Sequence, residues 1–328
     1  MEVSLPPVTV EVVAPDAVDL EDYCRLQRAA FARVLLRAGV SDRFMTPALY
    51  RWKYRPPSGP GRLALVRRGR RLVGSLGMIP VPIRHGGRRA LAWHIGDVAT
   101  APDERRQGHC RAGLIALDRS LGADEMIVGF PNASSSELFG EIGARPLARP
   151  RTWIGWTRTL TTRPHRSSPQ SWERSDRVGH LHEAVCPRDE TQFERSSSYL
   201  DWRYRDHPQV SYDLLVHGEP ARGFAVVRRA AFRAIRFGLL MELWATSVHA
   251  ERDLLRAARR WARERNLAWL AAIGAGSRRW TMVQAGLAPV PTPLIPRRLI
   301  MMGKGTGATT RDAAAARWHL QAGDWDAF

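Results

Sequence analysis

The stretch Gly96–Leu117 is the part of the sequence best suited to chemistry. It combines a predicted strand, a turn with two arginines and a helix that begins at Gly108. The first backbone N–H groups of a helix have no partner within it, and the helix dipole adds positive charge there. A glycine lets a phosphate approach that backbone closely. The turn Arg105–Cys110 therefore predicts a diphosphate site, with Arg105 and Arg106 adding charge.

Two common phosphate-binding patterns do not fit this turn. A P-loop needs Gly-x-x-x-x-Gly-Lys-Ser/Thr, and a dinucleotide fold needs Gly-x-Gly-x-x-Gly after its first strand. The turn instead resembles motif A of the GNAT (Gcn5-related N-acetyltransferase) family, Gln/Arg-x-x-Gly-x-Gly/Ala at a strand–turn–helix junction. Arg105 and Gly108 match this motif, and Cys110 replaces the usual small residue. With the predicted order of elements, the resemblance covers about residues 8–160.

The resemblance implies an α+β fold with a mixed, mostly antiparallel sheet flanked by helices, and acetyl-CoA as cosubstrate. In this family the backbone of the strand before the turn holds the pantetheine arm, and the amides of the turn bind the pyrophosphate. The residues expected at the cofactor are Val98, Ala99, Thr100, Arg105, Arg106, Gln107, Gly108, His109, Cys110 and Asn132. Asn132 is equally well interpreted as a turn residue. For Cys110, a small buried residue is the simpler interpretation beside that of a reactive thiol.

Attack of an amine on a thioester needs a base for the ammonium proton and an acid for the thiolate. The candidate bases are Asp97 and His94 on the strand, although each also has a purely structural interpretation. Their spacing places them on opposite faces unless a bulge intervenes. The tyrosine acid of the family falls at about Phe139, which cannot donate a proton. Three alternatives follow: another group serves as the acid, the thiolate leaves without an acid, or the domain does not catalyse the reaction.

The second half of the chain repeats short segments of the first in the same order. The matched pairs are Trp52–Arg55 with Trp202–Arg205, Ala99-Thr100 with Ala245-Thr246, and Gly143-Ala144 with Gly286-Leu287. This order indicates an internal duplication, as in bacterial two-domain GNAT proteins. We therefore predict a GNAT domain over residues 1–160, a linker over 161–180, a GNAT-like domain over 181–303 and a tail over 304–328. Trp52 and Trp202 are interpreted as packing residues.

The second copy lacks the glycine-containing turn. After Thr246 the sequence places Glu251 and Asp253 where the phosphates should bind. Negative charge there repels CoA. We interpret this half as a degenerate domain that does not bind the cofactor and supports the first.

Composition limits the other function classes. The net charge is +18, but the chain has only two lysines, Lys53 and Lys304, and its arginines are scattered. This pattern does not favour nucleic-acid binding as the main role. No apolar run approaches the roughly 20 residues that span a membrane, and the first residues do not resemble a secretory signal. Three widely spaced cysteines predict neither a disulfide framework nor a metal site. We expect a cytoplasmic protein.

The sequence thus predicts an acetyl-CoA-dependent N-acetyltransferase. The expected partner is a small-molecule amine, such as an amino sugar or another metabolite, with direct transfer of the acetyl group. Two alternatives remain: a CoA-binding module without turnover, and an arginine-rich nucleic-acid-binding protein.

Overall fold

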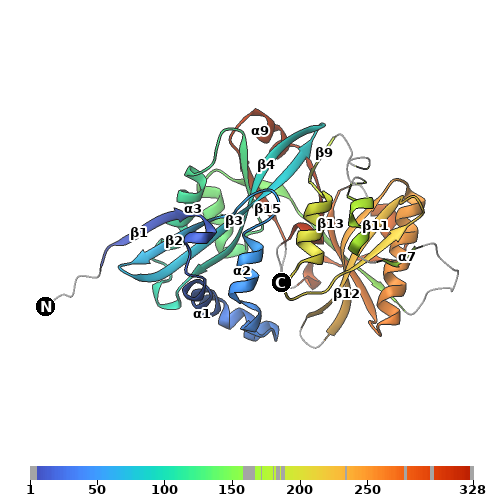
Figure 1. Cartoon of the computed structure of the whole chain (residues 1–328), viewed down its shortest axis with the longest axis horizontal. Helices are drawn as coiled ribbons and strands as arrows, with labels where there is room; N and C mark the ends of the chain where they lie inside the picture. The colour runs from blue at the N-terminus through green and yellow to red at the C-terminus, as the bar shows by residue number, and fades with distance from the viewer. Residues whose placement is uncertain are drawn as a thin grey trace. The chain divides into compact units, whose positions relative to one another are not determined.

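The computed structural model describes residues 6–157, 167–170, 172–179, 181, 185, 189–232, 235–276, 279–295 and 299–325 (Figure 1). The chain forms two compact units. The first comprises Met1–Pro82, Ala90–Pro146 and Met302–Ala314, and the second comprises Ile83–Arg89, Leu147–Met301 and Ala315–Phe328.

The first unit is built on a mixed sheet. Its strands are β1 (Val8–Val13), β2 (Arg62–Arg68), β3 (Arg71–His85), β4 (Arg88–Thr100), β5 (Glu125–Gly129), β6 (Arg145–Ala148) and β15 (Met301–Gly305). β1 pairs antiparallel with β2, and β2 with β3. β4 lies between β3 and β5 and runs parallel to β5, while β15 pairs antiparallel with β5. Runs of apolar and β-branched residues, such as Val8–Val13 and Leu63–Val66, form these strands.

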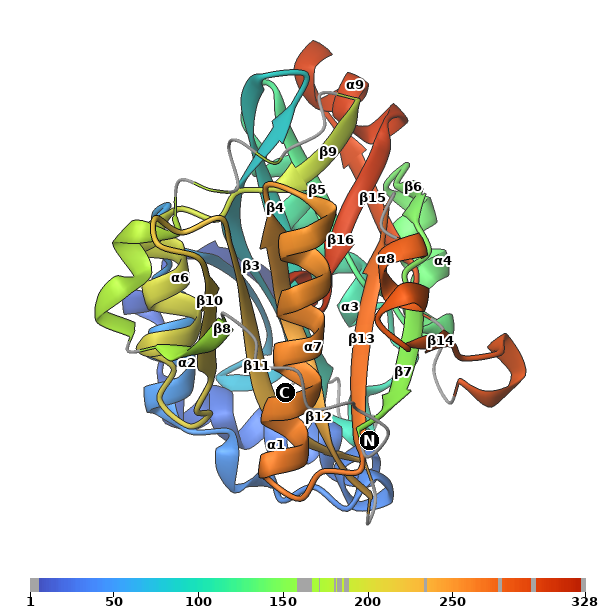
Figure 2. The same ribbon diagram turned by 90° about the vertical axis from the view of Figure 1, so that its right-hand side faces the viewer.

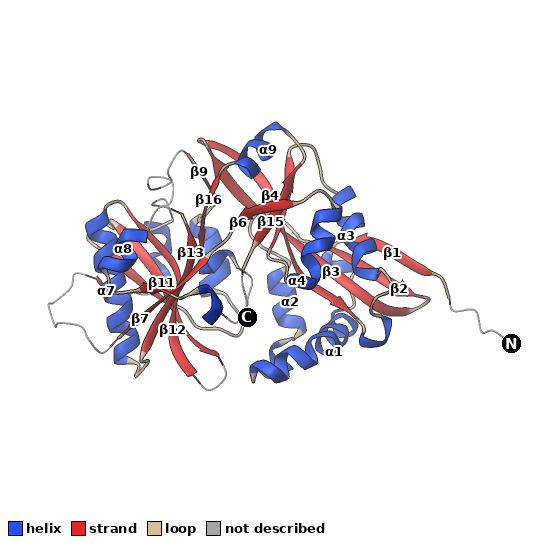
Figure 3. Ribbon diagram, turned by 180° about the vertical axis from the view of Figure 1, so that it is seen from behind, coloured by secondary structure: helices blue, strands red, loops and turns tan. Residues whose placement is uncertain are grey.

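Helices cover both faces of this sheet (Figure 3). They are α1 (Leu20–Ala38), α2 (Pro47–Lys53), α3 (His109–Arg119), α4 (Ala133–Glu141) and α9 (Ala308–Ala315), with short 3-10 turns η1 (Pro15–Ala17), η2 (Asp42–Phe44) and η3 (Pro102–Glu104). α1 begins where the sequence predicts, because the Asp19 carboxylate accepts the backbone N–H groups of Glu21 and Asp22. α3 packs so closely on β3 that a Cβ on Gly113 would come within 2.3 Å of Leu76.

The strands β4 and β5 separate part-way along their length. Their pairing runs from Leu91 opposite Glu125 to Ile95 opposite Gly129, whereas β4 continues to Thr100. Asp97, two residues beyond the last pair, has a φ of +51°. A non-glycine residue in this region interrupts the regular alternation of a strand. The β4 backbone beyond Ile95 therefore lies beside no β5 partner.

The second unit repeats the element order α2-β2-β3-β4-α3-β5-α4-β6. Its corresponding elements are η5 (Asp201–Arg205), β10 (Asp213–His217), β11 (Gly223–Phe232), β12 (Ile235–Ala245), α7 (Val248–Glu264), β13 (Trp269–Ala275), α8 (Arg279–Gln284) and β14 (Ala288–Pro289). α7 lies across β11, β12 and β13 (Figure 2). The apolar residues of α7, among them Leu254, Ala258 and Trp261, are buried.

Further elements complete the second unit. They are β7 (Arg151–Trp156), β8 (Ser167–Gln170), η4 (Trp172–Arg177), β9 (Glu190–Phe193), α6 (Ser197–Leu200), η6 (Thr292–Leu294), β16 (Arg317–Gln321) and η7 (Ala322–Asp324). β7 pairs antiparallel with β13. The end of β3, Ile83–His85, pairs with β9, and β16 joins β9 and β13.

Three boundaries differ from the sequence prediction. The stretch 304–328 is no simple tail, because it contains the end of β15 and all of α9 and β16. Part of the predicted linker forms β8, which pairs with β10. Residues 161–166 of the linker lie outside the described part of the chain, as does Cys186. β7 was assigned to the first domain but belongs to the second unit. In each case a strand finds its partner far away in the sequence, which local composition does not reveal.

Among the described residues, no helix is long and apolar enough to cross a membrane. Within the same ranges, no group of three or more His, Cys, Asp or Glu side chains is arranged to hold a metal ion.

Candidate active site

The turn between β4 and α3 leaves the start of α3 open. Gly108 is the N-cap residue, with φ +80°, and no described side chain caps the helix. A Cβ atom added to Gly108 would meet nothing within 4 Å. Arg106 also has a positive φ, +66°, so the chain turns sharply just before the helix. The first amides of α3 therefore lack a side-chain acceptor, and the space beside Gly108 is open, as a site for a ligand oxygen requires.

A network of side chains behind the turn fixes its shape. Arg68 donates to both oxygens of Glu104 at 3.0 Å, and His109 Nε2 lies 2.9 Å from Glu104 Oε2. Arg68 also donates to Gln107 Oε1 at 2.7 Å. The hydrogen bonds from Arg68, and then from His109, lower the pKa of Glu104 to about 2. The His109 side chain is thus turned inward, so only its backbone is available to a ligand.

The arginines of the turn differ in their surroundings. The Arg105 guanidinium donates to the Ala30 carbonyl of α1 at 2.8 Å and so ties the turn to that helix. Arg106 is exposed. Between them, the two side chains keep the turn anchored and positively charged.

Asp97 is held by a buried network where β4 leaves β5. Its carboxylate accepts from Lys53 Nζ at 2.8 Å and from the Tyr54 hydroxyl at 2.6 Å. The Tyr23 hydroxyl lies 2.9 Å from that of Tyr54. Burial raises the pKa of both tyrosines well above 10, so both remain protonated at neutral pH. Gln27 donates to the Asp97 carbonyl at 3.0 Å.

His94 occupies a different environment. It is buried and packs edge-to-face against Phe130, with ring centroids 5.6 Å apart. The Asp97 side chain instead contacts α2. The spacing of His94 and Asp97 predicts side chains on opposite faces of the strand unless a bulge intervenes. The positive φ of Asp97 is an irregularity of that kind.

The remaining predicted positions have clear local roles. Asn132 precedes α4, and its Oδ1 accepts the backbone N–H of Ser135 at 3.0 Å. Phe139 is buried against Gly129, where a Cβ would meet its ring at 2.7 Å. Cys110 is partly buried, and burial raises the pKa of its thiol to about 11. The raised pKa favours the interpretation of Cys110 as a small, partly buried residue over that of a reactive thiol.

Sequence reasoning missed Lys53, Tyr54 and the pair Arg68–Glu104. The sequence does contain a signal for Lys53 and Tyr54. Both belong to the segment Trp-Lys/Arg-Tyr-Arg, which occurs once in each half of the chain. Conversely, no local pattern links Arg68 to Glu104, since they are 36 residues apart.

The second unit lacks an open turn at the corresponding place. β12 ends at Ala245 and α7 begins at Val248. The Ser247 hydroxyl accepts the backbone N–H of Ala250 at 3.2 Å and so caps α7. Glu251 and Asp253 follow in its first turns and are both buried.

A carboxylate network in the second unit parallels that of Asp97. Glu242 on β12 accepts from the Tyr204 hydroxyl at 2.5 Å and from Arg195 Nε at 2.7 Å. Arg195 also pairs with Asp324 in η7. The exposed fractions of the Arg195, Glu242 and Asp324 side chains are 1%, 0% and 3%, against 11% and 12% for Lys53 and Asp97. The second network is sealed, whereas the first is accessible at its edge.

Comparison with protein families assigns the first unit. Residues 14–143 match the family model described as "Acetyltransferase (GNAT) domain". This segment is therefore similar to GNAT acetyltransferases, which use acetyl-CoA as their donor, and the similarity supports acyl transfer from an acyl-CoA.

Solved structures share the fold over nearly the whole chain. A probable N-acyltransferase from Enterococcus faecalis is 12% identical, with a TM-score of 0.66 over 94% of this chain and 74% of that one. A GCN5-related N-acetyltransferase from Kribbella flavida is 16% identical, with a TM-score of 0.61 over 95% and 74%. Saccharomyces cerevisiae N-myristoyltransferase with bound myristoyl-CoA is 13% identical, with a TM-score of 0.57 over 92% and 84%. A search of curated proteins gives no match.

The open turn of the GNAT domain fits an acyl-CoA. Its uncapped amides and left-handed Gly108 suit the pyrophosphate, and the unpaired edge of β4 suits an extended arm with amide groups. The residues of the chain thus agree with the donor that the family requires.

Proposed function

We propose that this chain is an acetyl-CoA-dependent N-acetyltransferase that acts on an amine of a small molecule, such as an amino sugar or another metabolite, by direct transfer. The observation that carries the proposal is the uncapped start of α3, where Gly108 has φ +80° and open space before it. The family match of residues 14–143 supports acyl transfer in general.

In this proposal the donor lies along β4 and the turn. Backbone groups of Val98, Ala99 and Thr100 hold the pantetheine arm, the amides of 106–110 hold the pyrophosphate, and Arg105 and Arg106 add positive charge. Asn132 directly precedes α4. The bound donor supplies a thioester carbonyl for attack by the acceptor amine.

Asp97 is the candidate to take the proton of the acceptor ammonium. It lies where β4 leaves β5, and its carboxylate is already arranged to receive N–H donors, as its contact with Lys53 Nζ shows. His94 is the second candidate, but its ring is packed against Phe130. A tyrosine that protonates the leaving group is not required on α4. A thiol has a pKa of about 8.5, so the thiolate can leave without being protonated first.

The second unit is, in this proposal, a degenerate copy that does not bind the donor. The capped helix α7 and its acidic first turns support this role, since the Ser247 hydroxyl occupies one of the first amides and the nearby negative charge repels a phosphate. The high net positive charge of the chain favours a small acceptor over a polycationic one.

Thiol release during incubation with acetyl-CoA and a library of amines tests the proposal. We expect release above the hydrolytic background with at least one small amine, together with a mass increase of that amine by one acetyl group. Calorimetry with acetyl-CoA runs in parallel. Binding without release for any amine would instead support the CoA-binding module without turnover, and neither binding nor release would reject both.

A further inference from the structure

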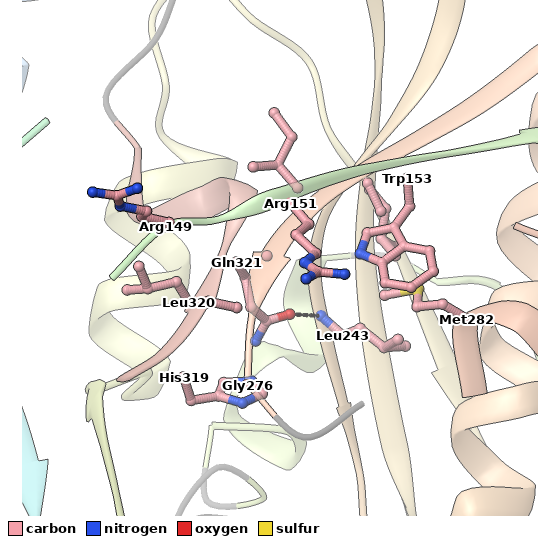
Figure 4. Close-up of a pocket in the computed structure, with 14 residues that line it drawn as sticks. Arg149, Arg151, Trp153, Leu243, Gly276, Met282, His319, Leu320 and Gln321 are labelled. Atoms are coloured by element: carbon pink, nitrogen blue, oxygen red, sulfur yellow. Dashed lines mark hydrogen bonds between the residues drawn. The ribbon is translucent and has the colours of Figure 1, made fainter. Parts of the chain in front are cut away.

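A pocket of about 90 Å³ lies within the second unit, where β12 and β13 separate (Figure 4). Their parallel pairing covers only Gly238–Leu240 and Leu270–Ala272. Farther along, β16 takes the place of β12 beside β13, starting at Gly274 opposite Gln321. The pocket occupies the gap between these two pairings. Since about 10–15 Å³ admits one water molecule, it has room for a compact group of several heavy atoms.

One side of the pocket is apolar and comes from three elements. Trp153 of β7, Leu240 and Leu243 of β12 and Met282 of α8 line it. Trp153, Leu240 and Leu243 belong to the buried core, and Met282 packs against it. This side offers a flat indole and aliphatic groups to the body of a ligand.

The other side carries hydrogen-bond donors that the protein itself does not use. Arg149 and Arg151 line the pocket, and neither makes an ion pair or a side-chain hydrogen bond with another described residue. The Arg151 side chain extends from β7 toward the middle of the pocket (Figure 4). Gln321 Oε1 accepts the backbone N–H of Leu243 at 2.5 Å, which leaves Gln321 Nε2 buried and without a partner.

No carboxylate balances these donors in the pocket wall. The described lining residues include no aspartate or glutamate. The carboxylate of Glu190 lies behind the wall, where its Oε2 is 3.4 Å from Nδ1 of the lining residue His319. A buried amide donor without an acceptor is costly, and the guanidinium groups of the exposed Arg149 and Arg151 can pair with an anion.

From these contacts we propose that the pocket is a binding site for a small organic monoanion, a carboxylate on a compact apolar body. Arg151 pairs with the carboxylate through its planar fork, and Gln321 Nε2 donates to the same group. The apolar body lies against Trp153 and Met282. The site lies entirely in the second unit and does not depend on acyl transfer by the first.

Calorimetry on the full chain tests the site with benzoate, phenylacetate and hexanoate, each compared with its neutral amide. We expect saturable binding of at least one carboxylate and at least about tenfold weaker binding of the matching amide. Arg151→Gln should weaken carboxylate binding by a similar factor. Arg229→Gln, which removes an exposed arginine of β11 in the same unit, should leave it unchanged.

The outcomes separate this site from the donor site. Gly108→Glu should leave carboxylate affinity intact while it disturbs acetyl-CoA binding. Absence of carboxylate binding to the wild-type chain would overturn the proposal. So would equal affinity for carboxylates and amides, or equal affinity of the wild-type and Arg151→Gln proteins. If Arg151→Gln fails to fold, the same test uses Arg149→Gln, which removes the other arginine of the pocket wall. The comparison of each carboxylate with its amide in the wild-type protein then decides whether the site recognises the anion.

Discussion

The two units place a tyrosine and a carboxylate at corresponding points of the same element order, yet their cations come from different points of the chain and only the first network is accessible. In the first, Tyr54 and Lys53 hold Asp97 on β4 beside an uncapped helix. In the second, Tyr204 and Arg195 hold Glu242 on β12 beside a capped one.

The difference lies in what surrounds each carboxylate. Asp324 of η7 adds a second acid to Arg195 and closes the network, and Gln321 of β16 occupies the backbone N–H of Leu243. A network that is fully enclosed contributes to specific folding, whereas one left at the edge of an open strand can meet a substrate. From this comparison we propose that the accessible network serves the acceptor site of the first unit, whereas the enclosed network stabilises the second unit.

The largest effect on stability is expected from Arg195→Met. The change leaves Glu242 and Asp324 buried without their cation, which should cost the second unit about 3–5 kcal/mol. Urea unfolding of the full chain, with hydrogen exchange at β12, measures the loss. Arg177→Met is the control, because its pair with Glu219 is exposed and should be worth at most about 1 kcal/mol. Equal losses in the two variants would contradict a sealed network.

The next effect concerns catalysis in the first unit. Asp97→Asn should lower the rate of thiol release by about 100-fold, since it removes a proton acceptor, while acetyl-CoA affinity changes little. Asp118→Asn provides a matched control, because Asp118 pairs with the other lysine of the chain, Lys304, at 2.8 Å. Comparable rates in the two variants would show that Asp97 is a structural carboxylate.

The two units should respond to acid in opposite directions. Burial raises the pKa of Asp324 from 3.8 to about 6, so its contribution to the stability of the second unit is present below pH 3.8 and is lost as the pH rises to 6. The pKa of Glu104 falls from 4.5 to about 2, so its contribution is present above pH 4.5 and is lost as the pH falls to 2.

Urea midpoints measured across this pH range check both signs. Asp324→Asn should flatten the dependence between pH 3.8 and 6, and Glu104→Gln should flatten it between pH 2 and 4.5. If either variant shows the same dependence of the urea midpoint on pH as the wild-type protein, the assigned protonation is contradicted.

The smallest effect is expected from Ser247→Ala at the start of α7. Loss of the cap should destabilise the second unit by about 1 kcal/mol. Acetyl-CoA affinity of the chain should not change, because Glu251 and Asp253 remain close to the freed amides. Additional acetyl-CoA bound per chain, measured by calorimetry, would show that the cap alone distinguishes the two helix ends.

Local patterns predict the elements of the first unit well. The Asp19 cap, the Pro47 start of α2 and the strand–turn–helix junction at Gly108 each follow from nearby residues. The open turn at the start of α3 was predictable for the same reason. Its chemistry depends on backbone groups within a few residues.

Long-range partners could not be predicted in this way. The pairing of β15 with β5, and of β7 with β13, joins segments more than 100 residues apart. The Lys53–Asp97 and Arg68–Glu104 pairs likewise depend on which strands lie side by side. Composition alone suggested a tail and a linker, because short strands completed by distant partners carry weak local signals.

Acetyl-CoA titration of Gly108→Glu and Gly87→Glu tests the central claim most directly. Both glycines have φ +80° and nothing within 4 Å of an added Cβ, so the two changes impose similar backbone strain. Of the two glycines, only Gly108 is the N-cap residue of α3. The account predicts wild-type affinity for Gly87→Glu and at least about 100-fold weaker binding for Gly108→Glu, because a carboxylate then stands before the amides. Equal affinity in the two variants, or no binding by the wild-type chain, would contradict it.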